Sequence, residues 1–232
     1  MNMHKVIGIV LITGVLISIM IWSTPVARLG SGFIVGDAQY ILTYYDLVKE
    51  SENIQIKFPN EDNIAAKPIY KNKTDNLVIL KLVQPPKVKR EPLFFQKENR
   101  NIKESYVFSL GYPWTNTLED KHIMLEGNLI MAIENETGLM KIDIQMDPIH
   151  SGSPLFNGKG EVVGMVISAE TLEDRGNYSE NPHPAIPSAV LIDLMNKNDI
   201  PFEGKSKTTL NISAMDEYIE MIRNNVVLIE AR

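Results

Sequence analysis

Asp147-Pro148-Ile149-His150-Ser151-Gly152-Ser153-Pro154-Leu155 is the stretch that decides the fold. It places a serine hydroxyl, that of Ser151, between a histidine and a glycine in a turn that leads into an apolar run. Acyl transfer by serine needs such a hydroxyl as nucleophile, a base to take its proton, a group that orients the base, and donors for the oxyanion. The stretch therefore predicts a nucleophile loop, and its chemistry depends on whether the other groups are present elsewhere in the chain.

Short apolar runs separated by turn residues fill most of the chain after residue 30. They predict strands at 32–35, 40–43, 54–58, 65–70 and 77–82, and a second group at 105–110, 123–133, 139–145, 154–156 and 162–168. The charged, Pro-bearing residues 84–103 connect the groups. Strands at this spacing, without alternating long helices, indicate an all-β barrel or sandwich. Short helices are expected at 189–197 and 213–224, with Ser188 and Ser213 as N-caps, and the apolar tail 226–229 is a candidate further strand.

Three segments, taken in order, resemble parts of one protease family. They are Gly30-Ser31-Gly32-Phe33-Ile34-Val35 with Tyr40-Ile41-Leu42-Thr43-Tyr44-Tyr45-Asp46-Leu47-Val48, then Lys73-Thr74-Asp75-Asn76-Leu77-Val78-Ile79-Leu80-Lys81-Leu82, then the Ser151 loop with Gly160-Glu161-Val162-Val163-Gly164-Met165. Their order and spacing over residues 29–197 are similar to those of the HtrA/Deg branch of the trypsin-like serine proteases. The resemblance implies an all-β fold of the chymotrypsin type, made of two β-barrels.

The resemblance assigns the triad-equivalent positions to Asp46, Asp75 and Ser151. In that family a Leu-Thr-x-x-His-Val-Val segment carries the general base, and a Thr-Asp-Leu-Ala-Val-Leu-Lys segment carries the aspartate that orients it. Here Asp46 stands in place of the histidine, and a carboxylate with an ordinary pKa near 3.9 is a much weaker base than imidazole. Because two neighbouring carboxylates repel, we expect Asp46 or Asp75 to bind a proton, a cation or a basic side chain.

The oxyanion site departs from the family as well. The family has glycine two residues before the serine, whereas this chain has Ile149. A β-branched side chain restricts the backbone and crowds the place of a substrate carbonyl. Gly152 is retained, and Ser153 replaces the next glycine. Loss of the base or of an oxyanion donor lowers the rate by several orders of magnitude, so the three triad-equivalent residues are expected to be non-functional.

Two alternatives would give the residues around Ser151 a chemical role: a substitute base or a metal site. His150, His122 or His183 would have to act as base for Ser151, although each is expected to be a surface or locally hydrogen-bonded imidazole. Asp46, Asp75 and His150 would alternatively hold a metal ion, since one imidazole and two carboxylates are acceptable ligands. The favoured interpretation contains no metal and no cofactor.

The first residues predict a membrane anchor. Residues 6–22 are continuously apolar, and the uncharged stretch between Lys5 and Arg28 can span about 30 Å of hydrocarbon. It has no polar stripe, and Thr24-Pro25-Val26-Ala27 is a poor cleavage site. A single-pass anchor is therefore favoured over a cleaved signal peptide or a soluble helix. Lys5 predicts a cytoplasmic N-terminus, with the rest of the chain in the periplasm or outside the cell.

Charge and composition narrow the possible partners. A net charge of −6 without long runs of one sign argues against nucleic acid, and the lack of cysteine excludes disulfides and thiolate chemistry. We expect an anchor at 1–28, a protease-fold domain at 29–200, and a C-terminal helix and tail at 201–232. The predicted function is a membrane-anchored, inactive protease homologue that binds a protein or an extended peptide. The alternatives are an active serine endopeptidase that uses Ser151 with an altered triad, and a metal-binding or sensory module.

Overall fold

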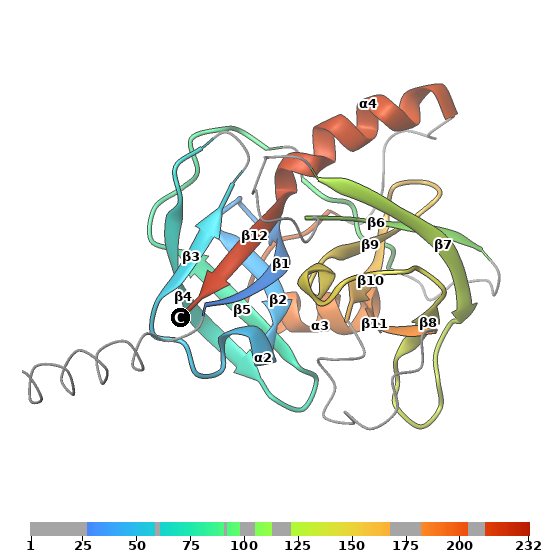
Figure 1. Ribbon diagram of the computed structural model, residues 1–232, viewed down its shortest axis with the longest axis horizontal. Coiled ribbons are helices and arrows are strands. Elements are labelled where there is room, and N and C mark those ends of the chain that lie inside the picture. The colour runs from blue at the N-terminus through green and yellow to red at the C-terminus, as the bar shows by residue number, and fades with distance from the viewer. Residues whose placement is uncertain are drawn as a thin grey trace, which may run out of the picture.

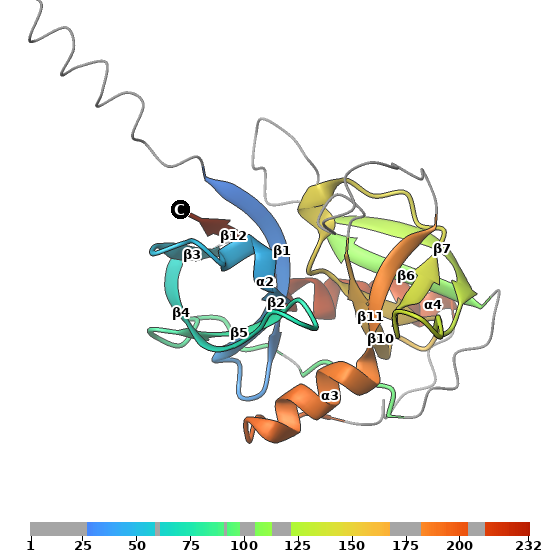
Figure 2. The same cartoon turned by 90° about the horizontal axis from the view of Figure 1, so that it is seen from below.

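Two closed β-barrels lie side by side in the computed structural model (Figures 1 and 2). It describes residues 27–58, 61–90, 92–97, 105–112, 122–167, 182–203 and 212–232, with side chains from residue 217 in the last range. The first barrel has the order β1-β12-β3-β4-β5-β2 and the second β10-β11-β8-β7-β6-β9. The strands are β1 (Arg28–Val35), β2 (Tyr40–Tyr44), β3 (Ile54–Lys57), β4 (Ile64–Asn72), β5 (Leu77–Leu82), β6 (Tyr106–Gly111), β7 (Ile123–Met131), β8 (Met140–Ile142), β9 (Pro154–Asn157), β10 (Val162–Val166), β11 (His183–Pro187) and β12 (Val226–Ala231). The all-β double-barrel fold expected from the sequence is confirmed.

Apolar side chains fill the second barrel and also cover the contact between the barrels. The interior of the second barrel includes Leu129, Ile142 and Val163. The outward side chains of Phe108 and Phe156 stack with ring centroids 5.0 Å apart, and they belong to the same buried cluster as the core of the first barrel. Burial of such large apolar side chains favours the docking of one barrel on the other.

Backbone hydrogen bonds hold residues 95 and 96 of the connection between the barrels. The amide of Phe95 donates to the carbonyl of Glu203 at 2.7 Å, and that of Gln96 donates to the carbonyl of Val162 at 3.0 Å. The Phe95 ring lies 6.4 Å from that of Phe33 in the first barrel. The segment that the sequence marks only as a connection therefore contributes to the core.

Three helices accompany the barrels: α2 (Tyr45–Val48), α3 (Ser188–Lys197) and α4 (Ile212–Ile222). The prediction that Ser188 caps α3 is wrong, because the helix begins at Ser188 with Pro187 as its N-cap, and the Ser188 hydroxyl donates to the carbonyl of Gln96 at 2.8 Å. The Ser213 side chain lies outside the described side chains. The candidate strand at 226–229 is confirmed as β12, and it completes the first barrel.

The expected membrane anchor at residues 6–22 lies outside the described residues. Within the described ranges, no helix is long and apolar enough to cross a bilayer. The prediction of a membrane-spanning segment therefore stays a prediction.

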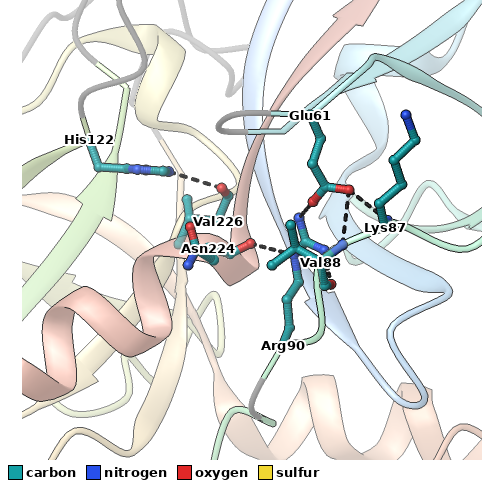
Figure 3. Close-up of polar contacts among 7 residues, drawn as sticks. All are labelled: Glu61, Lys87, Val88, Arg90, His122, Asn224 and Val226. Atoms are coloured by element: carbon teal, nitrogen blue, oxygen red, sulfur yellow. Dashed lines mark hydrogen bonds and ion pairs between the residues drawn. The ribbon is translucent and has the colours of Figure 1, made fainter.

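A buried ion pair fastens the start of β12 to the first barrel (Figure 3). The Arg90 guanidinium pairs with the Glu61 carboxylate and donates to the carbonyls of Asn224 at 2.8 Å and Val88 at 2.7 Å. Only 1% of the Arg90 side chain and 3% of the Glu61 side chain are exposed. Burial alone would raise the pKa of Glu61, but hydrogen bonds from Arg90 and two backbone amides, with the Arg90 charge, hold it below its usual value.

We predict that Arg90→Met destabilises the protein by about 3–5 kcal/mol, because it leaves the Glu61 carboxylate buried without its partner. The measurement is urea unfolding followed by fluorescence. The matched control is Asp62→Asn, which removes the solvent-exposed pair that Asp62 makes with Lys87 at 2.5 Å and should leave the midpoint nearly unchanged. Equal midpoints for the two variants would contradict the role given to Arg90.

Candidate functional site

Ser31 of β1 holds the Ser151 loop against the first barrel. Its amide donates to the Ser151 carbonyl at 2.9 Å, and its hydroxyl donates to the Ile149 carbonyl at 2.8 Å. The Ser31 carbonyl in turn accepts from the Thr43 hydroxyl at 2.7 Å. Gly152 has a φ of +90°, and a Cβ at this position would collide with the Ser31 carbonyl oxygen. The loop therefore requires glycine after the serine and has little freedom to shift.

The loop forms a short 3-10 turn at Pro148–His150. The Ser151 amide donates to the Pro148 carbonyl at 3.0 Å and closes this turn. In serine proteases the amide of the nucleophile is one of the two backbone donors that bind the oxyanion. Here that N–H is already used within the loop, and Ser151 itself is fully buried.

Ile149 fills the space on the other side of the turn. Its side chain is 2% exposed and packs with Tyr112, Leu228 and Leu29. Leu228 belongs to β12 and Tyr112 follows β6, so the isoleucine is held by both barrels. The expectation that Ile149 crowds a substrate carbonyl stays a prediction, since its described contacts are with apolar side chains of the two barrels.

Asp46 lies in the first turn of α2. Its carboxylate makes an ion pair with Lys49 at 3.1 Å, and the two side chains are 28% and 36% exposed. Its amide donates to the Asn76 side-chain oxygen at 3.0 Å, and its carbonyl accepts from Arg28 at 3.2 Å. Lys49 is thus the basic side chain that pairs with the Asp46 carboxylate.

Asn76, rather than Asp75, is the residue that contacts Asp46. Asp75 instead accepts a hydrogen bond from the Asn72 side-chain amide at 2.6 Å, and its charge acts on Lys197. The sequence comparison assigned the orienting position to Asp75 because Thr74-Asp75 matches the Thr-Asp pair of the family. The chain has one extra residue between this pair and the apolar run, and alignment on the run would have pointed to Asn76.

His150 and Ser153 point into one buried place beside Gly111. A Cβ at Gly111 would lie 2.9 Å from the Ser153 hydroxyl and 3.2 Å from Nε2 of His150. Nδ1 of His150 lies 3.3 Å from the Asp147 carbonyl, while its Nε2 and the Ser153 hydroxyl have no hydrogen-bond partner within the described part of the chain. Burial lowers the pKa of His150, and the carbonyl and charge of Asp147 oppose this only in part.

The other proposed bases lie at the beginnings of different strands, with His122 just before β7. Nε2 of His122 is 2.9 Å from the Val226 carbonyl, and its ring is 4.3 Å from that of Tyr112, so it links the second barrel to β12 (Figure 3). His183 begins β11. Across the described ranges, no three His, Asp or Glu side chains gather to hold a metal ion, and Asp46, Asp75 and His150 form no such group.

The fold and this arrangement agree with a known family. A trypsin-like peptidase domain matches residues 30–165, which is more than half of the chain, so the chain belongs to the trypsin-like peptidases. Within them it falls among homologues of the HtrA/DegP type, as the sequence resemblance implied. A probable periplasmic serine endoprotease, DegP-like, from Pseudomonas putida (strain GB-1) is 27% identical over 171 residues, which cover 73% of this chain and 34% of that protein.

One further relative gives the same result, and a solved structure supports the fold. A serine protease, HtrA-like, from Staphylococcus aureus (strain bovine RF122 / ET3-1) is 25% identical over 208 residues, covering 82% of this chain and 26% of that protein. The chain thus spans about a third or less of the length of these curated relatives. The crystal structure of a serine endoprotease from Yersinia pestis has a TM-score of 0.56 and 24% identity, covers 73% of this chain and 57% of that one, and supports the fold.

We predict that His150 makes the protein less stable in acid. Its pKa is lowered in the fold, so below the ordinary value near 6.5 the unfolded chain takes up a proton that the folded chain does not. Stability should therefore be greatest above that pH and fall as the pH drops toward the folded pKa. In His150→Asn, thermal unfolding midpoints between pH 7.5 and pH 5 should decline less steeply than in the wild type, and parallel declines would contradict the prediction.

Proposed function

We propose that this chain is a catalytically inactive serine protease homologue that acts as a protein-binding or assembly module. One observation carries the proposal: the position of the general base holds the carboxylate of Asp46, which is paired with Lys49. An aspartate in this ion pair is a weak base toward a serine hydroxyl at neutral pH. Removal of one triad member alone reduces catalysis to the small residue supplied by the oxyanion site and substrate binding.

The state of the oxyanion site supports the same proposal independently. The Ser151 amide donates to Pro148, so binding an oxyanion would require the turn to open. Loss of one oxyanion donor lowers the rate by about 10²–10³-fold. Since Ile149 is packed between the barrels, opening the turn would also expose its apolar side chain.

The second barrel offers a place for an extended peptide. The Leu129 amide donates to the Ser105 carbonyl on the β6 side, so the amides and carbonyls of Met124 and Glu126 face the opposite side of β7. In the described chain, β8 pairs with β7 at Leu129 and Met131, and the Asp143 amide donates to the Asn128 carbonyl at 3.1 Å. Among the described residues, no strand pairs with the outer side of Met124 and Glu126, which therefore form a short strand edge. Such an edge suits a partner that binds by β-augmentation.

The proposed location is a membrane surface outside the cytoplasm, with residues 1–28 as the anchor. The apolar run at 6–22 and Lys5 before it support the anchor and its orientation. The Pseudomonas putida relative is described as periplasmic, which supports an extracytoplasmic domain.

An active-site-directed probe tests the proposal against an active endopeptidase. A fluorophosphonate reacts with an activated serine hydroxyl, and we predict that it labels the wild type no faster than Ser151→Ala. An unstructured substrate such as casein should likewise remain intact. Labelling or cleavage that Ser151→Ala abolishes would establish the alternative, an enzyme with an altered triad.

Restoring the missing groups gives the complementary prediction. The triple variant Asp46→His, Asn76→Asp and Ile149→Gly supplies a base, its orienting carboxylate and a small residue at the oxyanion position. Its fluorophosphonate labelling should be at least about tenfold faster than that of the wild type. The control carries Ser151→Ala in addition and should not react. Equal labelling of the triple variant and its control would contradict this prediction. It would mean that features other than these three residues keep Ser151 unreactive.

A further inference from the structure

The first barrel is closed by the far end of the chain. Strands β1 to β5 are consecutive in sequence and form a sheet in the order β3-β4-β5-β2-β1, whose two edges are β3 and β1. The last strand, β12, lies between these edges, as Figure 1 shows in the red arrow that ends at the C-terminus. The gap between β1 and β3 is therefore a strand-binding slot, and β12 is the extended peptide that occupies it.

Pairing along both sides of the slot is extensive. β12 pairs with β1 from Arg28↔Ala231 to Phe33↔Val226, and with β3 from Ile54↔Ala231 to Lys57↔Leu228. At its end the Arg232 amide donates to the Asn53 carbonyl at 2.9 Å, and the Arg232 carbonyl accepts from the amides of Asn53 and Glu52. These are main-chain contacts of the kind that hold an added strand in a sheet.

Side chains make the slot selective for this strand. Glu230 pairs with Lys57 of β3 at 2.5 Å, and the pair lowers the pKa of Glu230. The side chain of Ile229 fills the space in front of Gly32, where a Cβ would come within 2.7 Å of its terminal carbon. On the outer side, Leu228 packs on Ile149, next to the Ser151 loop. The slot thus fits an apolar strand with a glutamate near its end, which is the sequence of β12 itself.

We propose that β12 is exchangeable, so that the slot of one copy takes β12 of a second copy. The contacts of β12 with the slot are the same whether the strand comes from its own chain or from another, so protein concentration and the geometry of the connection decide between the two states. Charge complementarity between Lys57 and Glu230 and the fit of Ile229 to Gly32 favour a second copy over an unrelated peptide. This inference is independent of whether Ser151 is active.

The described part of the connection to β12 consists of α4 and the 3-10 turn Arg223–Asn225. α4 precedes the strand and lies over the second barrel, above β6 and β7 in Figure 1. From residue 217 onward, the helix is held by the Tyr218 hydroxyl, which donates to the Gly160 carbonyl at 2.6 Å, and by the buried Ile222. Exchange would move α4 and β12 together, and the body of each copy would keep its remaining strands.

Cysteine cross-linking tests the exchange, because the chain has no cysteine of its own. Gln55 and Glu230 face each other across β3 and β12, so full-length Gln55→Cys and Glu230→Cys chains of different tagged mass are mixed, incubated at high concentration and oxidised. The matched control mixes Lys67→Cys and Lys81→Cys chains, which face each other across β4 and β5 and cannot exchange with β12. A chain with both Gln55→Cys and Glu230→Cys checks the pairing within one copy.

We expect the Gln55→Cys and Glu230→Cys mixture to give a disulfide-linked heterodimer in several-fold higher yield than the control mixture on a non-reducing gel. The double variant should form the link within one chain in its monomer fraction. A heterodimer yield equal to that of the control would overturn the proposal. Failure of the double variant to form the link would count against it too, because the exchange is inferred from this register.

Discussion

The contact between Ser31 and the Ser151 loop is the constraint on which the site depends. Three hydrogen bonds converge on Ser31, two to the loop and one from Thr43. Gly152 allows the loop to approach the Ser31 carbonyl so closely that no side chain fits between them. Because β1 also borders β12 and β2, the loop is positioned by the first barrel although it belongs to the second.

This constraint fixes the shape of the loop, and the loss of its chemistry is what we propose from two features. The turn that seats the loop uses the Ser151 amide for the Pro148 carbonyl, and the loop's Ile149 binds Leu228 of the C-terminal strand. The base position, across the barrel junction, holds an aspartate that is neutralised by Lys49. The two departures lie in different barrels and affect different steps of catalysis. Together they are the basis for proposing a binding role in place of catalysis.

Much of the fold could be predicted from local patterns. Alternating apolar residues in β3, the apolar run of β5 and the ordered protease-like segments were enough for two barrels. The strand that closes the first barrel, β12, could not be assigned to it in the same way. Nothing in residues 226–231 indicates that they pair with β1, almost two hundred residues earlier. The Glu61–Arg90 pair and the Ser31 contacts join residues far apart in sequence and leave no local signal either.

At the site, the loss of the base stays a prediction, whereas the residue that contacts Asp46 is Asn76, one position after the Asp75 that the sequence suggested. Asp75 and Asn76 are adjacent, and only the turn that precedes β5 decides which side chain reaches the amide of Asp46. The 3-10 turn before Ser151 depends on the carbonyl of Pro148, which composition does not reveal.

Amide hydrogen exchange at Ser151, followed by NMR, tests the central claim most directly. An amide that is buried and bonded to Pro148 should exchange as slowly as the strand amides around it, such as that of Val166, which donates to Ser153 at 2.9 Å. Exchange as fast as in solvent-exposed turns would mean that the donor is open to a substrate oxyanion, and would contradict the account.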